Sequence, residues 1–344
     1  MNKRTIADLI LQFPANRENE NVFVFLDNEG KEEQVLTFNE LREQCTRIAQ
    51  NLLTVCNPRE IVLLCADNQA EFTLSFLGCI LAGVIPAPLP PIRSVRDRTG
   101  MGRLKTILQE EQISKVLIAE KYREQLDSTN TEVLTLASLQ KENNNSVTLP
   151  DISPGDIAWI QYTSGSTTHP KGVVLRHENV VSNLAFMYRV FNRQELVRVA
   201  GWLPFHHDMG LLGHLFTVLY ESGFGVFMPA TSFLASPAAW LQMISDYKAN
   251  AAAAPAFAFE LCSRKALPTM DLSSWKYVYV GAETVPVETL NTFATKFAAA
   301  GFDRNAFKPV YGLAEASLLV AGGGMGMDEL DTAVYRKQID SSQV

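Results

Sequence analysis

A hydroxyl-rich segment that ends in a lysine is the stretch of this sequence best suited to chemistry. It runs from Gln161 to Gly172 and gathers five hydroxyl side chains around one glycine before Pro170. Small residues let the backbone come close to a ligand, so that N–H and hydroxyl groups can converge on it, and the lysine adds a positive charge. This combination favours a polyphosphate ligand. The residues concerned are Thr163, Ser164, Gly165, Ser166, Thr167, Thr168 and Lys171.

This segment is not a Walker A loop, because that motif has a glycine directly before its lysine and opens a helix. Here Pro170 precedes Lys171, and β-branched residues follow. The apolar segments on either side, 156–161 and 172–177, predict two strands with a loop between them. An ordinary solvent-exposed Ser/Gly hairpin loop is the alternative that the segment by itself leaves open.

The elements around this loop predict an α/β protein. Strands and helices alternate along the chain, which is typical of a doubly wound parallel sheet. We expect a first lobe over about 1–140, a polar linker over 141–154 and a second lobe over 155–325, followed by a loop over 326–344. Within the lobes, Asn39 is expected to cap a helix that ends near Leu53, and one helix is expected over 209–220.

Composition narrows the class of protein. The chain has 344 residues, of which 47% are hydrophobic and 19% charged, as in globular proteins. Its net charge of −7 favours no nucleic acid partner. The five cysteines are scattered in apolar contexts, which predicts buried reduced thiols in a cytoplasmic protein. The uncharged stretch 72–92 is interrupted by prolines from Pro86 onward, so its helix falls below the roughly 20 residues of a membrane span.

Three further segments follow predicted strands, where open α/β sheets place ligands. They are 202–211 (WLPFHHDMGL), 280–284 (VGAET) and 311–316 (YGLAEA). Together with the hydroxyl-rich loop, and in this order, they resemble the adenylate-forming superfamily, most closely the fatty acyl-AMP ligases that load acyl chains onto acyl carrier proteins. The resemblance covers about Thr5 to Gly324. It implies the large N-terminal domain of that family, with two stacked, mostly parallel doubly wound sheets, helices between and outside them, and a smaller β-rich part.

The resemblance implies an enzyme that converts ATP and a fatty acid into an acyl-adenylate and pyrophosphate. The loop and Lys171 would then hold the β- and γ-phosphates, and Glu315 would bind Mg²⁺. Tyr311 matches the aromatic residue that stacks on adenine. Each has a plainer interpretation, since Glu315 also suits a helix start and Tyr311 also suits a core. The other nucleotide positions implied are Gly281, Ala282, Glu283, Gly312, Leu313 and Ala314.

The acyl chain would lie beside the segment 202–211. His207 matches the family position next to the acyl channel and the adenylate, and would serve catalysis with Lys171 and Glu315. Met209, Gly210 and Phe257 would form the channel wall, with core packing as the alternative for Met209 and Phe257. Asp208 is expected to cap a helix. The run 206–208 is a poor metal site, because neighbouring side chains of an extended segment diverge.

The sequence also departs from the family pattern. Ala314 stands where most of the superfamily has threonine, Ala256 where these ligases usually have asparagine, and Thr284 where they often have proline. The family's small C-terminal domain, which carries a further catalytic lysine, does not appear before Val344. We therefore expect the large domain of a longer ligase or of a polyketide or peptide loading module, which turns over slowly by itself. A coenzyme A ligase and a non-catalytic acyl- or nucleotide-binding module are the alternatives.

Overall fold

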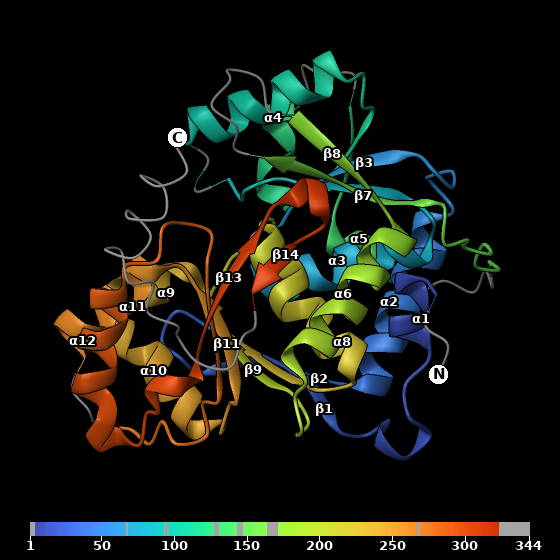
Figure 1. The fold of residues 1–344 in the computed structure, drawn as a ribbon. Coiled ribbons are helices and arrows are strands. Elements are labelled where there is room, and N and C mark those ends of the chain that lie inside the picture. The colour runs from blue at the N-terminus through green and yellow to red at the C-terminus, as the bar shows by residue number, and fades with distance from the viewer. Residues whose placement is uncertain are drawn as a thin grey trace, which may run out of the picture.

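The computed structural model describes residues 4–66, 68–92, 94, 96–126, 131–142, 147–163, 171–266 and 269–322. Strands form a large sheet, a smaller parallel sheet and a two-stranded hairpin, with helices around them (Figure 1). This confirms the predicted α/β class and the mostly parallel sheets.

The large sheet has eight strands within the described residues. Its neighbours are parallel except β1 with β2 and β13 with β14, which pair antiparallel. In spatial order the strands are β14 (Leu319–Gly322), β13 (Phe307–Gly312), β12 (Tyr277–Val280), β11 (Ala251–Ala254), β9 (Arg198–Gly201), β10 (Phe224–Phe227), β1 (Asn21–Leu26) and β2 (Glu32–Thr37).

The smaller sheet is parallel throughout. Its strands lie in the order β4 (Ile85–Pro88), β3 (Ile61–Cys65), β5 (Lys115–Ile118) and β6 (Glu132–Leu134). The hairpin consists of β7 (Ile157–Thr163) and β8 (Lys171–Arg176), and β7 packs along β4. The strands predicted on either side of the hydroxyl-rich loop are thus confirmed as an antiparallel pair.

Helices lie on both sides of the large sheet. In Figure 1, α9 to α12 gather on the left, and α1, α2, α3, α6 and α8 on the right. The α-helices are α1 (Ile6–Leu11), α2 (Phe38–Leu52), α3 (Gln69–Leu81), α4 (Arg98–Glu110), α5 (Leu136–Leu139), α6 (His177–Phe191), α7 (Asp208–Gly210), α8 (Thr217–Glu221), α9 (Ala230–Ala235), α10 (Pro237–Asp246), α11 (Ala256–Lys265) and α12 (Val287–Phe297). The short helical turns are η1 (Ala15–Arg17), η2 (Glu120–Leu126), the π-helical η3 (Leu211–Phe216), η4 (Ala298–Ala300), η5 (Arg304–Ala306) and η6 (Ala314–Ala316).

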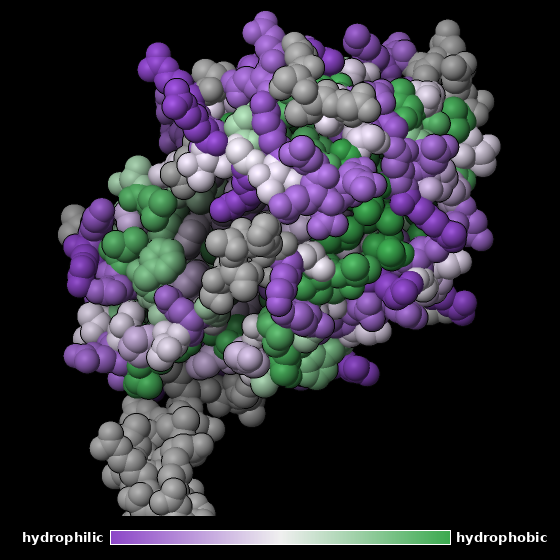
Figure 2. All heavy atoms as spheres, turned by 90° about the horizontal axis from the view of Figure 1, so that it is seen from above, coloured by the Kyte–Doolittle hydropathy of each residue, from purple (hydrophilic) through white to green (hydrophobic). Residues whose placement is uncertain are grey.

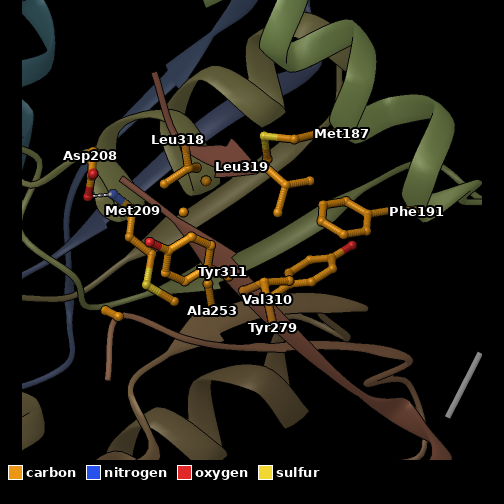
Figure 3. A pocket seen from close by; sticks show the side chains of 13 residues that line it. Met187, Phe191, Asp208, Met209, Ala253, Tyr279, Val310, Tyr311, Leu318 and Leu319 are labelled. Atoms are coloured by element: carbon orange, nitrogen blue, oxygen red, sulfur yellow. Dashed lines mark hydrogen bonds between the residues drawn. The ribbon is translucent and has the colours of Figure 1, made fainter. Parts of the chain in front are cut away.

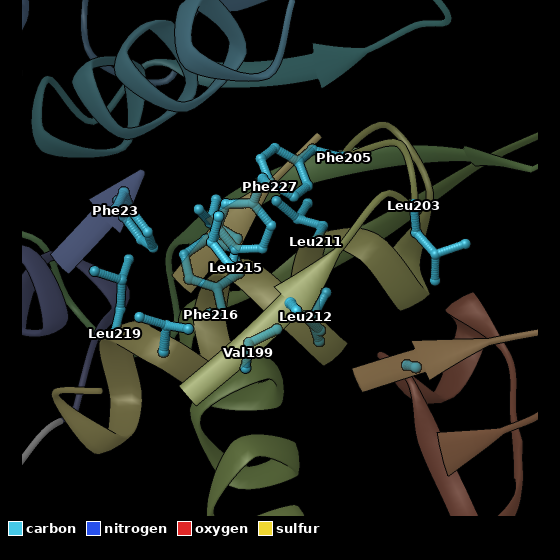
Figure 4. Packing of buried hydrophobic residues seen from close by; sticks show 14 of the residues in the cluster. Phe23, Val199, Leu203, Phe205, Leu211, Leu212, Leu215, Phe216, Leu219 and Phe227 are labelled. Atoms are coloured by element: carbon cyan, nitrogen blue, oxygen red, sulfur yellow. The ribbon is translucent and has the colours of Figure 1, made fainter. Parts of the chain in front are cut away.

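The larger of two hydrophobic clusters in the described part of the chain includes residues of both sheets. Trp159 of the hairpin stacks on Phe216 of η3, with 5.7 Å between the ring centroids. Figure 4 shows the side chains of η3 packing with those of β1, β9 and β10. On the surface seen from above, hydrophobic residues gather in patches between hydrophilic ones (Figure 2). Helix α3, whose one charged residue is Glu71 in its first turn, is buried almost all round, as the uncharged stretch from Phe72 predicts.

Two expectations need correction, and the two expected lobes share one sheet. Thr37, not Asn39, caps α2, because its hydroxyl accepts the Glu40 N–H in a capping box. The helix expected over 209–220 is divided into α7, η3 and α8. The lobe boundaries remain a prediction, but β1 and β2 of the expected first lobe pair with β10 of the second, so the large sheet combines both.

All five cysteines are buried, and burial raises the pKa of the Cys56 thiol to about 11 and of the Cys262 thiol to about 12. This confirms the prediction of buried thiols. Within the described ranges, no helix has both the length and the apolar character needed to cross a membrane.

Two buried histidines make stability depend on pH. His177 Nδ1 accepts the Ile6 N–H at 3.2 Å, and His214 Nε2 accepts the Ala253 N–H at 3.0 Å. Burial lowers the pKa of His177 from 6.5 to about 4 and of His214 to about 3. Between these values and 6.5 the unfolded chain binds protons that the folded chain does not, so stability falls as the pH falls.

We expect each histidine to contribute a slope of up to about 1.4 kcal/mol per pH unit below pH 6.5. Urea unfolding at a series of pH values measures it. His177→Gln is the matched variant, since its amide oxygen can still accept the Ile6 N–H without titrating. An equal slope in the variant and the parent protein would contradict the assignment.

Candidate active site

Three of the predicted segments meet at one edge of the large sheet. β11, β12 and β13 are parallel neighbours, so the residues after each strand emerge at the same edge. The segment 281–283 follows β12, the segment 311–315 begins in the last two residues of β13, and α11 with Phe257 follows β11. The Phe257 N–H donates to Glu283 Oε1 at 2.8 Å, which ties two of these segments together.

Two glycines allow the backbone segments to approach closely. A Cβ atom on Gly281 would lie 2.6 Å from the Val310 carbonyl oxygen, and one on Gly312 would lie 2.0 Å from that of Leu318. Ala282, which follows Gly281, has a φ of +66°, a left-handed conformation that non-glycine residues rarely adopt. Strained backbone of this kind is concentrated at functional sites.

Tyr311 and Glu315 both face solvent. The Tyr311 residue is 63% exposed, which rules out the core interpretation of this side chain. Glu315 lies in η6 and is also exposed, while Ala314 beside it is buried. An exposed aromatic ring near the end of β13 is available to stack on a flat ligand.

Asn183 of α6 holds the turn that carries Glu315. Its Nδ2 donates to the carbonyl oxygens of Leu319, at 2.9 Å, and Ala316, at 3.2 Å. Its Oδ1 accepts the Leu319 N–H at 3.0 Å. The Asn183 amide therefore pairs with backbone groups of this turn, as a neighbouring strand would, and fixes η6 against α6.

An apolar pocket opens between α6, the segment 208–213 and β11 to β14 (Figure 3). Of the predicted site residues, Met209, Ala282, Tyr311 and Gly312 line it, and Asp208 does too. Most of its surface is apolar. The remaining lining residues are Met187, Phe191, Gly213, Ala253, Tyr279, Val310, Leu318 and Leu319.

Other predicted residues do not line this pocket. His207 is exposed, and Phe257 is 38% exposed with its ring against Trp202, 6.0 Å between centroids. Gly210 is buried behind the pocket, where a Cβ atom would lie 2.3 Å from the Pro204 carbonyl oxygen. The rest of this group is Lys171, Gly281, Glu283, Leu313, Ala314 and Glu315.

The hairpin carries the ends of the hydroxyl-rich loop. Thr163 and Lys171 lie opposite each other in the β7–β8 ladder, so they form its two ends. Gln161 Nε2 donates to the His206 carbonyl oxygen at 2.6 Å and ties the hairpin to the segment before Asp208. The loop residues Ser164, Gly165, Ser166, Thr167 and Thr168 lie outside the described residues, as does the Thr163 side chain, so their expected role stays a prediction.

Asp208 and Glu315 bring two carboxylates near each other. Burial raises the pKa of Asp208, the Met209 N–H and His207 oppose this, and the negative charge of Glu315 adds to the rise. Asp208 is the first residue of α7 rather than its cap, although its Oδ1 accepts the Met209 N–H at 2.6 Å. Among the described residues no group of three His, Cys, Asp or Glu side chains is placed to hold a metal ion.

His214 separates two strands at the point where the strand order reverses. The chain passes from β9 to β10 on one side and then to β11 on the other, and such switch points form ligand crevices. β9 and β11 pair only at Val199 and Ala251. Beyond that point His214 Nε2 accepts a hydrogen bond from the Ala253 N–H. On the other side of the ring, a Cβ atom on Gly201 would lie 2.5 Å from His214 Nδ1. The imidazole therefore fills the space between β9 and β11 beside Ala253.

Three positioning residues were not predicted: Gln161, Asn183 and His214. Each acts through a hydrogen bond to a backbone group more than 30 residues away in sequence. The only sequence signal is a polar residue inside an otherwise apolar run, as at His214 between Leu212 and Leu215. That signal does not reveal the partner.

The chain is similar to known proteins. Residues 12–338 match the family described as AMP-binding enzymes. The chain is 33% identical to the medium-chain-fatty-acid–[acyl-carrier-protein] ligase JamA of Moorena producens, over 92% of this chain and 56% of that protein. It is 30% identical to the ligase TtuA of Teredinibacter turnerae, which has the same description, over 93% of this chain and 57% of that protein. The chain thus spans little more than half the length of these relatives.

Solved structures agree with the fold. The fatty acid AMP ligase from Legionella pneumophila superposes with a TM-score of 0.86 at 32% identity, over 93% of this chain and 56% of that one. A fatty acyl-adenylate ligase from the same organism, in complex with acyl adenylate and pyrophosphate, superposes with a TM-score of 0.85 at 32% identity, over 93% of this chain and 57% of that one. With the match that runs through residues 12–338, this chain belongs to the family of AMP-binding enzymes.

Proposed function

We propose that this chain is the large domain of a ligase that activates a fatty acid with ATP to acyl-adenylate and pyrophosphate. The observation that carries the proposal is the apolar pocket at the carboxyl edge of the large sheet, with the exposed Tyr311 ring on its wall. An alkyl chain gains about 0.8 kcal/mol for each methylene buried on such a surface. The names of the relatives, medium-chain ligases of acyl carrier proteins, support the same substrate class.

The nucleotide would lie on the edge formed by 281–283 and 311–314. Tyr311 would stack on adenine, and the close backbone approach at Gly281 and Gly312 leaves a flat surface beside it. The hydroxyl-rich loop with Lys171 would hold the β- and γ-phosphates. Lys171 suits this place, because it lies at the end of a hairpin that Gln161 ties to the segment before Asp208.

The reaction needs charge stabilisation rather than covalent catalysis by the protein. A carboxylate oxygen of the acid forms a bond to the α-phosphorus while the bond from that phosphorus to pyrophosphate breaks. Negative charge then increases on the leaving pyrophosphate, where Lys171 and the loop donors would neutralise it. Glu315 would hold Mg²⁺, which supplies positive charge beside the phosphates and suits a carboxylate oxygen. His207, Met209, Gly210 and Phe257 would border the acyl group.

The acyl group would then pass to the phosphopantetheine thiol of an acyl carrier protein, as in loading for polyketide, peptide or lipid assembly. The names of JamA and TtuA support this acceptor. Coenzyme A is the second candidate acceptor, supported by the name of a 29% identical protein from Caulobacter vibrioides, a putative acyl-CoA synthetase. A cytoplasmic location belongs to the proposal too, supported by the buried thiols.

Calorimetric binding of a decanoyl sulfamoyl adenosine, a stable analogue of an acyl-adenylate, tests the site without requiring turnover. We expect Tyr311→Ala to weaken this binding by about 5- to 150-fold, because stacking of a base on an aromatic side chain contributes about 1–3 kcal/mol. Tyr188→Ala is the control, since Tyr188 is also an exposed tyrosine but lies on α6 outside the pocket lining. No binding by the parent chain, or equal binding by Tyr311→Ala, would refute the proposed nucleotide site.

The acceptor is tested in the longer protein that contains this chain. Incubation with ATP, decanoate and either coenzyme A or a phosphopantetheinylated carrier protein is followed by mass spectrometry of the acyl thioester. Acylated carrier protein without acyl-CoA is the expected result. Acyl-CoA as the only product would establish the second candidate instead.

A further inference from the structure

Two aromatic rings close the end of the apolar pocket. Phe191, the last residue of α6, and Tyr279 of β12 have ring centroids 4.2 Å apart, with 37° between the ring planes. Both residues are more than nine-tenths buried. Figure 3 shows them on the side of the pocket opposite Asp208, with their rings turned toward the space between. An occupant that extends from the Asp208 side therefore meets these rings last.

A buried ion pair holds the Tyr279 ring. The Arg193 Nη1 donates to the Tyr279 hydroxyl at 2.5 Å. The same guanidinium binds Glu221 through Nη2 and through Nε, the latter at 3.1 Å from Oε2. The Arg193 and Glu221 side chains are 1% and 7% exposed. The Arg193 guanidinium carbon also lies 5.4 Å from the centroid of the Phe191 ring, within the range of a cation–π contact.

These contacts join three elements behind the rings. Arg193 follows α6, Glu221 ends α8, and Tyr279 lies in the middle of β12. Moving the Tyr279 ring out of the way would take its hydroxyl from a buried guanidinium, and buried charges that lose a partner are costly. A phenylalanine at position 279 would lack the hydroxyl that accepts this hydrogen bond from Arg193. The rings are thus a fixed wall rather than a mobile side-chain layer.

We infer that the Phe191–Tyr279 wall, held by Arg193 and Glu221, sets the greatest length of acyl chain that the pocket accepts. This inference rests on the proposed acyl site and adds to it the residues that select among fatty acids. Chains that end before the wall gain affinity with each methylene, and longer chains have to bend back or leave the tail in water. The substrate class is therefore fatty acids of limited length, with a sharp fall in affinity beyond the wall.

The test is a binding series of acyl sulfamoyl adenosines from butanoyl to hexadecanoyl, titrated calorimetrically into the chain and its Phe191→Ala variant. The parent chain is expected to show an optimum length followed by a fall. Phe191→Ala is expected to move the optimum to longer chains, with an affinity gain of about fourfold for each further methylene that enters the new space. Analogues shorter than the original optimum should bind as before.

Tyr188→Ala is the matched control, because it removes a ring from the same helix, one turn earlier, at a position that is 49% exposed. Its length profile should equal that of the parent. If Phe191→Ala does not fold, as judged by thermal unfolding, Phe191→Leu gives the same test with a smaller shift. If a folded Phe191 variant shows the same dependence of affinity on chain length as the parent, the inference that the wall limits chain length is wrong. A parent chain that binds no analogue of any length refutes the proposed function instead.

Discussion

Replacing Glu315 by glutamine is expected to lower the rate of acyl-adenylate formation by about 100-fold or more. Removing one preorganised charge-stabilising group from an active site costs about 10²–10³ in rate, and glutamine keeps the size but not the charge of glutamate. Glu315 is exposed, in a turn that Asn183 fixes to α6. Burial raises the pKa of Asp208 and the negative charge of Glu315 adds to the rise, so the two carboxylates are close enough to interact.

Folding should be almost unaffected by this change. A substitution at an exposed position away from caps and ion pairs alters the free energy of unfolding by less than about 0.5 kcal/mol. The measurement is pyrophosphate release by the longer protein that contains this chain, with decanoate and ATP over a range of Mg²⁺ concentrations. Glu288→Gln is the control, since Glu288 is an exposed glutamate at the start of α12. A Glu315→Gln enzyme that works at the parent rate would exclude Glu315 from the reaction.

Replacing Arg193 by leucine is expected to lower the free energy of unfolding by about 3–5 kcal/mol. The change leaves Glu221 as a buried carboxylate without its cation and the Tyr279 hydroxyl without its donor. Guanidinium chloride unfolding followed by tryptophan fluorescence measures it. Arg264→Leu is the control, because Arg264 pairs with Glu260 on the surface, where such pairs contribute at most about 1 kcal/mol.

A double variant separates charge burial from packing. Arg193→Met combined with Glu221→Leu removes both charges and leaves apolar side chains, so most of the lost stability should return. The Tyr279 ring would then be held less firmly, and the fall in affinity for long acyl sulfamoyl adenosines should become more gradual. A single Arg193→Leu variant as stable as Arg264→Leu would show that the buried pair does not hold the pocket end.

The sequence predicted the local structure around the site well. The alternation of apolar runs and helical periods located the strands that carry 281–283 and 311–315, and the hydroxyl-rich loop between two apolar segments predicted the β7–β8 hairpin. These are short-range properties, because strand and helix patterns depend on neighbouring residues. The exposed Tyr311 also agrees with its predicted place at the site rather than in a core.

Some predictions failed for equally local reasons. Thr37 takes the cap expected at Asn39, because Glu40 completes a capping box only with Thr37. The π-helical turns of η3 interrupt the helix expected over 209–220, and periodicity alone does not distinguish them from α-helix. The pairing of β1 with β10 joins residues about 200 positions apart, which no local pattern specifies.

What the sequence determined by itself was the chemistry available: a hydroxyl-rich loop with Lys171, an aromatic residue and a carboxylate after one strand, and the segment 202–211 with His207 and Met209. Only the tertiary structure decided how these are held and where the pocket ends. His214 fills the space between β9 and β11, Asn183 fixes the Glu315 turn, and Arg193 holds the Tyr279 wall. Each does so through a partner distant in sequence, and such contacts exist only once the two sheets and their helices have packed together.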